Sequence, residues 1–305
     1  MTTSATAGQI ELVHAQKKTR IIWFAVAWLA SLAAFWGLLT RMRILALGDE
    51  RYTYLVFVPV ISLLFIWMRR ERVLRVSRYG PETGLPLIFA GVCLTFLSAK
   101  WFWLGESEHL SVMACGMLLT WIGLGAMVFG FASLREATFP LLFLLLLIPI
   151  PPNVMDAAVT ALQRASAEMT TVVFKVIGMP FLRRGFTFSL PGIDIEIARE
   201  CSGIRSTLSL LLSAIVVGYL FLRSTWNQLF LAVVTIPIVI FKNAVRIAII
   251  SWLGIYVDRG FFFGNLHRRG GLAFSLIAIA PMGLVLWSLF RTERIGEKLA
   301  SKQEN

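Results

Sequence analysis

Long apolar stretches, separated by short polar segments, make up most of the chain. A helix needs about 20 apolar residues to cross the roughly 30 Å hydrocarbon core of a bilayer. The pattern therefore predicts eight membrane-spanning helices. Their approximate ranges are 20–39, 52–68, 84–99, 110–131, 134–150, 202–222, 227–252 and 271–290. The expected fold class is an all-α polytopic membrane protein.

Residues 151–200 interrupt this pattern. The segment opens with Pro151 and Pro152, which do not continue a helix. Between residues 155 and 177 the apolar side chains recur on one side of a helix, which predicts an amphipathic helix lying at the membrane surface. The apolar side consists of Ala158, Leu162, Ala165, Met169, Val172, Val173 and Val176. The polar residues elsewhere on this helix are Gln163, Arg164, Glu168 and Lys175.

A short β-hairpin is expected after the amphipathic helix. Residues 186–190 and 193–197 each alternate between apolar and polar side chains, and Pro191-Gly192 between them has the residue types of a turn. The hairpin ends shortly before Cys201. Helix and hairpin together are predicted to lie between the fifth and sixth membrane helices, outside the hydrocarbon.

The composition excludes a soluble enzyme and a disordered chain. Of the 305 residues 57% are hydrophobic and only 15% are charged, and the mean hydropathy is +0.76. A soluble domain is about 45–50% apolar and about 25% charged. The net charge of +12 fits loops that face anionic lipid, and nothing resembles a nucleic-acid module. The bilayer is therefore an expected partner and nucleic acid is not.

The basic residues orient the chain, because short cytoplasmic loops carry an excess of Lys and Arg. With the N-terminus inside, the cytoplasmic set is Lys17, Lys18, Arg20, Arg69, Arg70, Arg72, Arg75, Arg78, Arg135, Arg223, Arg291, Arg294, Lys298 and Lys302. Both termini inside is the better fit, although Arg268 and Arg269 argue mildly against it. The prediction is one integral membrane domain divided into a cytoplasmic tail (1–19), five helices (20–150), an extracytoplasmic segment (151–200), helices six to eight (201–290) and a second cytoplasmic tail (291–305).

Three places are chemically unusual for a membrane protein, and the first is Arg199-Glu200-Cys201-Ser202-Gly203-Ile204-Arg205. If the sixth helix starts near Ser202, Cys201 lies in its N-cap region and Arg205 shares its face. The positive helix end and a nearby guanidinium both favour the thiolate form of a cysteine, which is the nucleophile. The alternative is that Cys201 is a small apolar residue at a helix boundary.

The second place is Lys242-Asn243-Ala244-Val245-Arg246, inside the seventh apolar stretch. An Arg in such a stretch costs about 2.5–3.5 kcal/mol on insertion scales unless it faces a polar cavity or a partner. Because residues 247–253 continue the apolar run, Arg246 is expected to lie below the membrane surface and point inward, on the same face as Asn243. The alternative is a side chain that snorkels from a helix end, which suits Lys242 better than Arg246.

The third place is Gly264-Asn265-Leu266-His267-Arg268-Arg269-Gly270-Gly271, just before the last helix. In the predicted topology His267 lies at the same membrane face as Cys201, and an imidazole moves protons at neutral pH. A single His in a polar loop usually has no such function, and His14 and His109 are interpreted as structural. Together, a thiol, an imidazole and a buried guanidinium are a complete set for cysteine acyl transfer.

The motifs resemble those of the exosortase/archaeosortase family of membrane cysteine transpeptidases. They are Glu200-Cys201-Ser202-Gly203-Ile204-Arg205-Ser206, Asn243-x-x-Arg246-Ile247 and His267 before the last helix. The resemblance implies that Cys201, Arg246 and His267 are the catalytic residues. Glu200, Arg205 and Asn243 would support them.

The resemblance also reaches the second predicted helix. Tyr52-Thr53-Tyr54-Leu55 through Pro59 matches a stretch that usually reads Tyr-Ser-His-Gly in the family. Tyr54 and Leu55 depart from that pattern, which puts any role of the family's His in doubt. A His at position 267 resembles the bacterial members, since archaeal relatives tend to have Arg there.

Members of the family process exported proteins that carry a C-terminal sorting signal, made of a short motif (typically Pro-Glu-Pro), a membrane-spanning helix and a basic tail. The resemblance thus implies a cysteine peptidase or transpeptidase at the outer face of a bacterial inner membrane. Cys201 would form a thioester with the substrate, His267 would act as general acid and base, and Arg246 would hold the oxyanion or the substrate carbonyl. The acceptor is water or a cell-envelope molecule such as a lipid or glycan.

No cofactor is expected, because one Cys and one His on this face give no tetrahedral metal-ligand set. Two other function classes stay open. A polytopic transporter would also use intramembrane Arg and Lys, but it would not need a Cys and a His at one surface. A purely hydrolytic intramembrane cysteine protease would share the chemistry and resolve the thioester with water alone.

Overall fold

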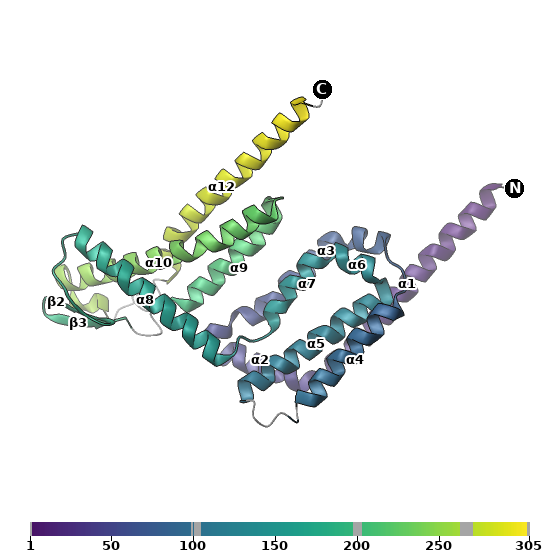
Figure 1. Cartoon of the computed structure of the whole chain (residues 1–305), viewed down its shortest axis with the longest axis horizontal. Coiled ribbons are helices and arrows are strands. Elements are labelled where there is room, and N and C mark those ends of the chain that lie inside the picture. The colour runs from purple at the N-terminus through teal and green to yellow at the C-terminus, as the bar shows by residue number, and fades with distance from the viewer. Residues whose placement is uncertain (1, 99, 101–104, 198–202, 263–270, 304–305) are drawn as a thin grey trace. The chain divides into compact units, whose positions relative to one another are not determined.

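The computed structural model describes residues 2–98, 100, 105–197, 203–262 and 271–303. The chain divides into two compact units, Met1–Pro152 and Asn153–Asn305 (Figure 1). The elements of the first unit are α1 (Thr2–Ala34), α2 (Trp36–Gly48), η1 (Glu50–Tyr52), α3 (Tyr54–Arg75), α4 (Pro81–Ser98), α5 (Glu106–Phe129), α6 (Phe131–Glu136), α7 (Thr138–Leu144) and η2 (Leu145–Leu147). The elements of the second unit are α8 (Pro152–Val176), β1 (Leu182–Arg184), β2 (Thr187–Leu190), β3 (Ile193–Glu196), α9 (Ile204–Phe221), α10 (Thr225–Tyr256), η4 (Arg259–Phe262) and α12 (Gly271–Gln303).

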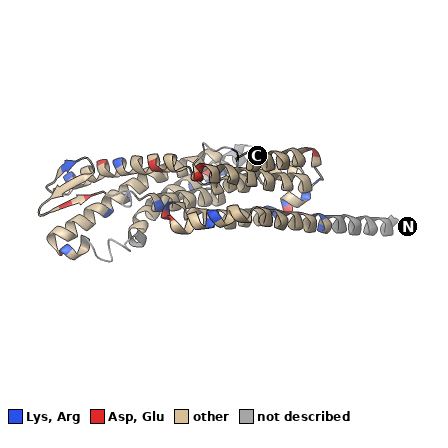
Figure 2. Cartoon of the chain, turned by 90° about the horizontal axis from the view of Figure 1, so that it is seen from below, with Lys and Arg blue, Asp and Glu red and all other residues tan. Residues whose placement is uncertain are grey.

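Six of the described helices are long and apolar enough to cross a membrane, and the number rises to eight if two bent helix pairs count as one span each. The six are Glu50–Arg75, Pro81–Ser98, Glu106–Phe129, Ile204–Phe221, Thr225–Tyr256 and Phe274–Gly296. Figure 2 shows that most of the described ribbon carries no charged side chain. The predicted all-α polytopic membrane fold is confirmed.

Two predicted spans are interrupted. The stretch at 20–39 is broken at Phe35, whose backbone leaves the helical region (φ −93°, ψ 13°), so that α1 and α2 meet at a bend of 69°. The stretch at 134–150 is divided among α6, α7 and η2. A new helix that begins at Thr138 places Pro140 in its first turn, where the missing N–H breaks no helical hydrogen bond.

In the first unit, α4 and α5 pack backbone against backbone (Figure 1). A β-carbon added at Gly84 would lie 2.5 Å from Cα of Met127, and one added at Gly91 would lie 2.5 Å from the carbonyl oxygen of Gly116. Real β-carbons do not approach other atoms this closely. Glycine is therefore required at these positions for the two helices to meet at this distance.

In the second unit, the three strands form an antiparallel sheet in the order β1-β2-β3. The predicted hairpin is confirmed: Leu190 pairs with Ile193 across Pro191-Gly192, and Gly192 adopts φ +81°, which glycine does without steric cost. Strand β1 was not predicted. It has only three residues, two of them Arg, and it is recognisable only through its pairing with β2.

A buried core joins this sheet to α8 and α10. Its members are Ala167, Phe174, Met179, Phe188, Leu190, Ile197 and Ala248. The rings of Phe174 and Phe188 meet edge to face, with centroids 5.4 Å apart. Ile197 directly follows β3 and is 1% exposed, so this core fixes the point at which the chain leaves the sheet.

The helix predicted at 155–177 is α8, but the side that faces the protein is not the predicted apolar side. Of the four predicted polar residues only Gln163 is buried. None of the seven residues of the predicted apolar side is buried. The buried side instead consists of Met155, Val159, Gln163, Ser166, Ala167, Thr170 and Phe174. Of the seven residues Val173 is partly buried against the core. The location of the apolar side at the membrane surface stays a prediction.

Candidate active site

The described part of the candidate site lies in the second unit. Arg205, Asn243 and Arg246 lie on α9 and α10, whereas Glu200, Cys201 and His267 lie outside the described residues. The residues on either side of 198–202 are described, however. They are the end of β3, the first turn of α9 and the helices that contact them.

The first turn of α9 begins later than the sequence suggested. Its N-cap is Gly203, in the left-handed region at φ +77°, and the helix starts at Ile204. The predicted shared face of Cys201 and Arg205 assumed a helix start near Ser202. Cys201 lies outside the described residues, so the shared face stays a prediction. Arg205 is the second helical residue, and its side chain is exposed.

The carbonyl oxygen of Gly203 is held by the turn that follows it. It accepts hydrogen bonds from the backbone N–H of Thr207 at 2.8 Å, from Oγ1 of Thr207 at 2.9 Å and from Oγ of Ser206 at 2.9 Å. The N-terminal end of α9 is consequently well defined. Its remaining N–H groups and its dipole favour negative charge at this position.

Lys242 on α10 contacts this same turn. Its side chain is only 2% exposed, and Nζ donates a hydrogen bond to Oγ of Ser206 at 2.7 Å. The interpretation that Lys242 snorkels from a helix end is therefore wrong. The amino group turns inward because a hydroxyl acceptor on the neighbouring helix is within its reach.

Asn243, the next residue, connects α10 to α8. It is 1% exposed, and Nδ2 donates to Oγ of Ser166 at 3.0 Å. Asn243 also lies beside the N-cap of α9, since a β-carbon at Gly203 would be 3.4 Å from Cγ of Asn243. The predicted supporting residue thus lies where three helices meet.

Arg246 follows Lys242 by one helical turn and is partly buried. Residues three and four positions apart share a face of a helix, so Arg246 lies on the same side of α10 as Asn243 and Lys242. Among the residues that the structure describes, no group of three or more His, Cys, Asp or Glu side chains could hold a metal ion.

Gln163 on α8 is a site residue that the sequence did not single out. It is 5% exposed, and Nε2 donates to the carbonyl oxygen of Ile197 at 2.5 Å. The two residues are 34 positions apart, so no local pattern signals their contact. In the sequence Gln163 is one of four polar residues outside the predicted apolar side of the helix, and nothing distinguishes it from the other three.

The second region of the resemblance, Tyr52 to Pro59, lies in the first unit at η1 and the start of α3. Tyr52 donates its hydroxyl to the carbonyl oxygen of Ile150 at 2.8 Å. Tyr54 is 9% exposed, and its hydroxyl has no hydrogen-bond partner within the described ranges. Tyr52 therefore makes a contact that connects η1 to the end of the first unit.

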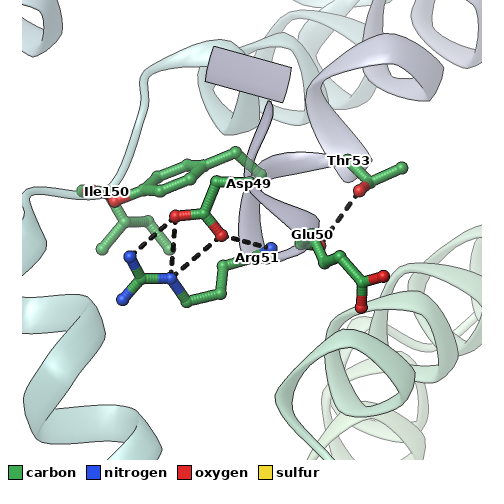
Figure 3. Close-up of polar contacts among 6 residues, drawn as sticks. Asp49, Glu50, Arg51, Thr53 and Ile150 are labelled. Carbon is green, nitrogen blue, oxygen red and sulfur yellow. Dashed lines mark hydrogen bonds and ion pairs between the residues drawn. The ribbon is translucent and has the colours of Figure 1, made fainter. Parts of the chain in front are cut away.

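A charged turn precedes this region (Figure 3). Nη2 of Arg51 lies 2.7 Å from Oδ2 of Asp49, and the backbone N–H of Arg51 donates to Oδ1 of Asp49 at 2.9 Å. The hydrogen bond from the Arg51 side chain holds the pKa of the Asp49 carboxyl below its usual value. The pair caps η1 and fixes the turn between α2 and α3.

The family model of the transmembrane exosortases matches residues 42–284, a range that includes all six predicted site residues. No curated protein and no solved structure matches the chain.

Proposed function

The chain belongs to the transmembrane exosortase family, and on this premise we propose that it is a membrane cysteine peptidase or transpeptidase. Its substrates are exported proteins with a C-terminal sorting signal that consists of a short motif, a membrane-spanning helix and a basic tail. Cleavage takes place at the outer face of the bacterial inner membrane. The acceptor is water or a lipid or glycan of the cell envelope.

The contact between Lys242 and Ser206 carries this proposal. It joins the polar turn of α10, which contains Asn243 and precedes Arg246, to the first turn of α9. That first turn follows Cys201 closely in the chain. Polar side chains within a membrane are costly and are typical of functional sites, and here they surround the helix end nearest to the candidate nucleophile.

In the proposed reaction the Cys201 thiolate attacks the scissile carbonyl carbon, and the carbonyl electron pair moves onto oxygen. Arg246 stabilises this oxyanion through its guanidinium donors. The C–N bond then breaks as His267 gives a proton to the leaving amine, which leaves a thioester on Cys201. Neutral His267 next removes a proton from the acceptor, whose attack on the thioester releases the Cys201 thiolate.

The test of this proposal is a Cys201→Ala variant with Cys115→Ala as its control, co-expressed with a tagged substrate that carries the sorting signal. We expect the cleaved product to disappear in Cys201→Ala at an unchanged membrane level, because only the nucleophile is lost. Cys115 lies within α5 of the first unit, and its replacement should leave cleavage intact. Cleavage that continues in Cys201→Ala at the wild-type rate would exclude the covalent mechanism.

A trapped adduct separates the open alternatives. A substrate thioester on Cys201, detected by mass spectrometry, excludes a transporter. The mass of the released product then distinguishes hydrolysis from transfer to an envelope molecule, because hydrolysis adds only water at the new C-terminus.

The proposed orientation has a separate test. Reporter fusions after residues 45, 104, 190 and 265 should report the outside, and fusions after 75, 134, 224 and 300 the cytoplasm. A cytoplasmic reporter at 190 would put Cys201 in the wrong compartment for an exported substrate.

A further inference from the structure

Buried polar side chains hold the described residues at both ends of the segment 198–202. At one end, Nε2 of Gln163 donates to the carbonyl oxygen of Ile197. At the other end, Nζ of Lys242 donates to Oγ of Ser206, and that hydroxyl donates in turn to the carbonyl oxygen of Gly203. The two carbonyl groups so held belong to the last described residue before the segment and the first one after it.

The two anchors are also joined to each other. Gln163 and Ser166 lie one turn apart on the buried side of α8. Lys242 and Asn243 are adjacent on α10, and Asn243 donates to Oγ of Ser166 at 3.0 Å. Gln163 on α8 and Lys242 on α10 are therefore connected through the hydrogen bond between Ser166 and Asn243. A shift of either helix would disturb both anchors.

Packing alone does not account for these residues. A buried polar group loses its hydration, and an apolar side chain of similar volume often serves stability equally well. A hydrogen bond differs from an apolar contact because it fixes distance and direction. Gln163 and Lys242 each extend a long side chain to an acceptor of its own, Ile197 O and Ser206 Oγ. Each hydrogen bond orients a short stretch of backbone.

Resting on the proposed function, we propose that Gln163 and Lys242 are positioning residues for the cysteine reaction. They set the two ends of the chain segment that contains the nucleophile, Gln163 through Ile197 and Lys242 through Ser206 and Gly203. They do not touch the substrate. A catalytic group displaced by about 1 Å can lose about 10²-fold in rate, so this anchoring acts on the chemical step.

The experiment compares Gln163→Leu and Lys242→Met with wild type in the full-length protein, in membranes. We expect kcat for substrate cleavage to fall about 10²-fold, with KM within about twofold of wild type, because the loss affects chemistry and not substrate binding. The second readout is the rate at which a small maleimide alkylates Cys201, followed by peptide mass spectrometry. We expect this rate to rise several-fold as the segment becomes less constrained.

Two control variants match the chemistry without touching the anchors. Gln228→Leu removes a side-chain amide that donates to the carbonyl oxygen of Leu222 at 2.9 Å, at the other end of α9. Ser213→Ala removes a hydroxyl that donates to the carbonyl oxygen of Ser209 within α9. Both should keep the wild-type kcat and the wild-type alkylation rate.

Smaller substitutions decide the question if the first variants do not accumulate. Gln163→Glu keeps the shape but in its ionised form cannot donate to a carbonyl. Ser206→Ala removes the hydroxyl that accepts from Lys242 and donates to the carbonyl oxygen of Gly203. Wild-type kcat and alkylation in these folded variants, or a rise in KM with unchanged kcat, would overturn the proposal. Alkylation of Cys201 needs no substrate. The alkylation rate therefore still tests the anchoring if the substrate assignment is wrong, or if cleavage survives in Cys201→Ala.

Discussion

Two helix contacts, one in each unit, are built in different ways. In the first unit α4 and α5 approach so closely at Gly84 and Gly91 that no β-carbon fits. In the second unit α10 meets its neighbours through Lys242 and Asn243, which donate hydrogen bonds to side chains on α9 and α8. One contact depends on the absence of side chains and the other on their chemistry.

The difference shows which kind of helix contact can supply functional groups for a reaction. Lipid tails are as apolar as the helices, so burial alone does not drive helices together, and close packing or interhelical hydrogen bonds must do so. A glycine contact provides rigidity but no functional group. A polar contact costs more to bury, yet it brings donors and acceptors together, and in this chain it does so next to the segment that contains Cys201.

The largest expected effect concerns Arg246 in the second unit. Arg246→Lys should insert normally but cleave substrate about 10²–10³-fold more slowly, a loss of roughly 3–4 kcal/mol in transition-state stabilisation. Lys keeps the charge and snorkels as well as Arg, but it lacks the planar guanidinium with several donors. The measurement is the initial cleavage rate at equal protein level.

Arg69→Lys in the first unit is the matched control. Arg69 donates from Nη1 to the carbonyl oxygen of Glu136 at 3.1 Å, a contact within the first unit. We expect no change in cleavage rate. Full activity of Arg246→Lys would return Arg246 to a structural role and leave Cys201 and His267 as a dyad.

A smaller effect is expected from breaking the glycine contact. Gly84→Ala introduces a β-carbon 2.5 Å from the backbone of Met127, so α4 and α5 must separate, at a cost of about 1–3 kcal/mol. Gly283→Ala in α12 of the second unit meets nothing within 4 Å and should leave stability unchanged or slightly higher. Thermal unfolding in detergent measures both. Equal melting temperatures for the two variants would show that the close approach of α4 and α5 is not needed.

The smallest loss of stability is expected for a substitution at Gly203. The same substitution should also slow cleavage. Gly203→Ala must hold φ near +77°, which costs about 1–2 kcal/mol for a residue with a β-carbon. Gly178→Ala has the same backbone cost at φ +71°, with nothing within 4 Å of its β-carbon. We expect similar losses of stability but slower cleavage only in Gly203→Ala, which lies at the N-cap of α9. Equal cleavage rates would contradict the role assigned to this turn.

Much of the fold could be predicted because membrane helices and a tight hairpin leave local signals. The hairpin followed from alternation around Pro191-Gly192, and α8 from a helical period. The break at Phe35 left no such signal, since it lies within a continuous apolar stretch, whereas the break before Thr138 follows Arg135 and Glu136 and precedes Pro140. The candidate site was predicted only in part: Asn243 and Arg246 are unusual for their surroundings, whereas Gln163 and Ser206 look ordinary until their partners are known.

By itself, therefore, the sequence determined that this chain is a polytopic membrane protein with one polar segment and a small set of reactive residues. Hydropathy decides this locally, because each spanning helix satisfies its own backbone groups in lipid. Only the tertiary structure decided which side of α8 faces the protein and where Lys242 points. Both outcomes depend on acceptors that are far away in the sequence, Ile197 for Gln163 and Ser206 for Lys242. A buried donor turns toward an acceptor that the fold brings within its reach.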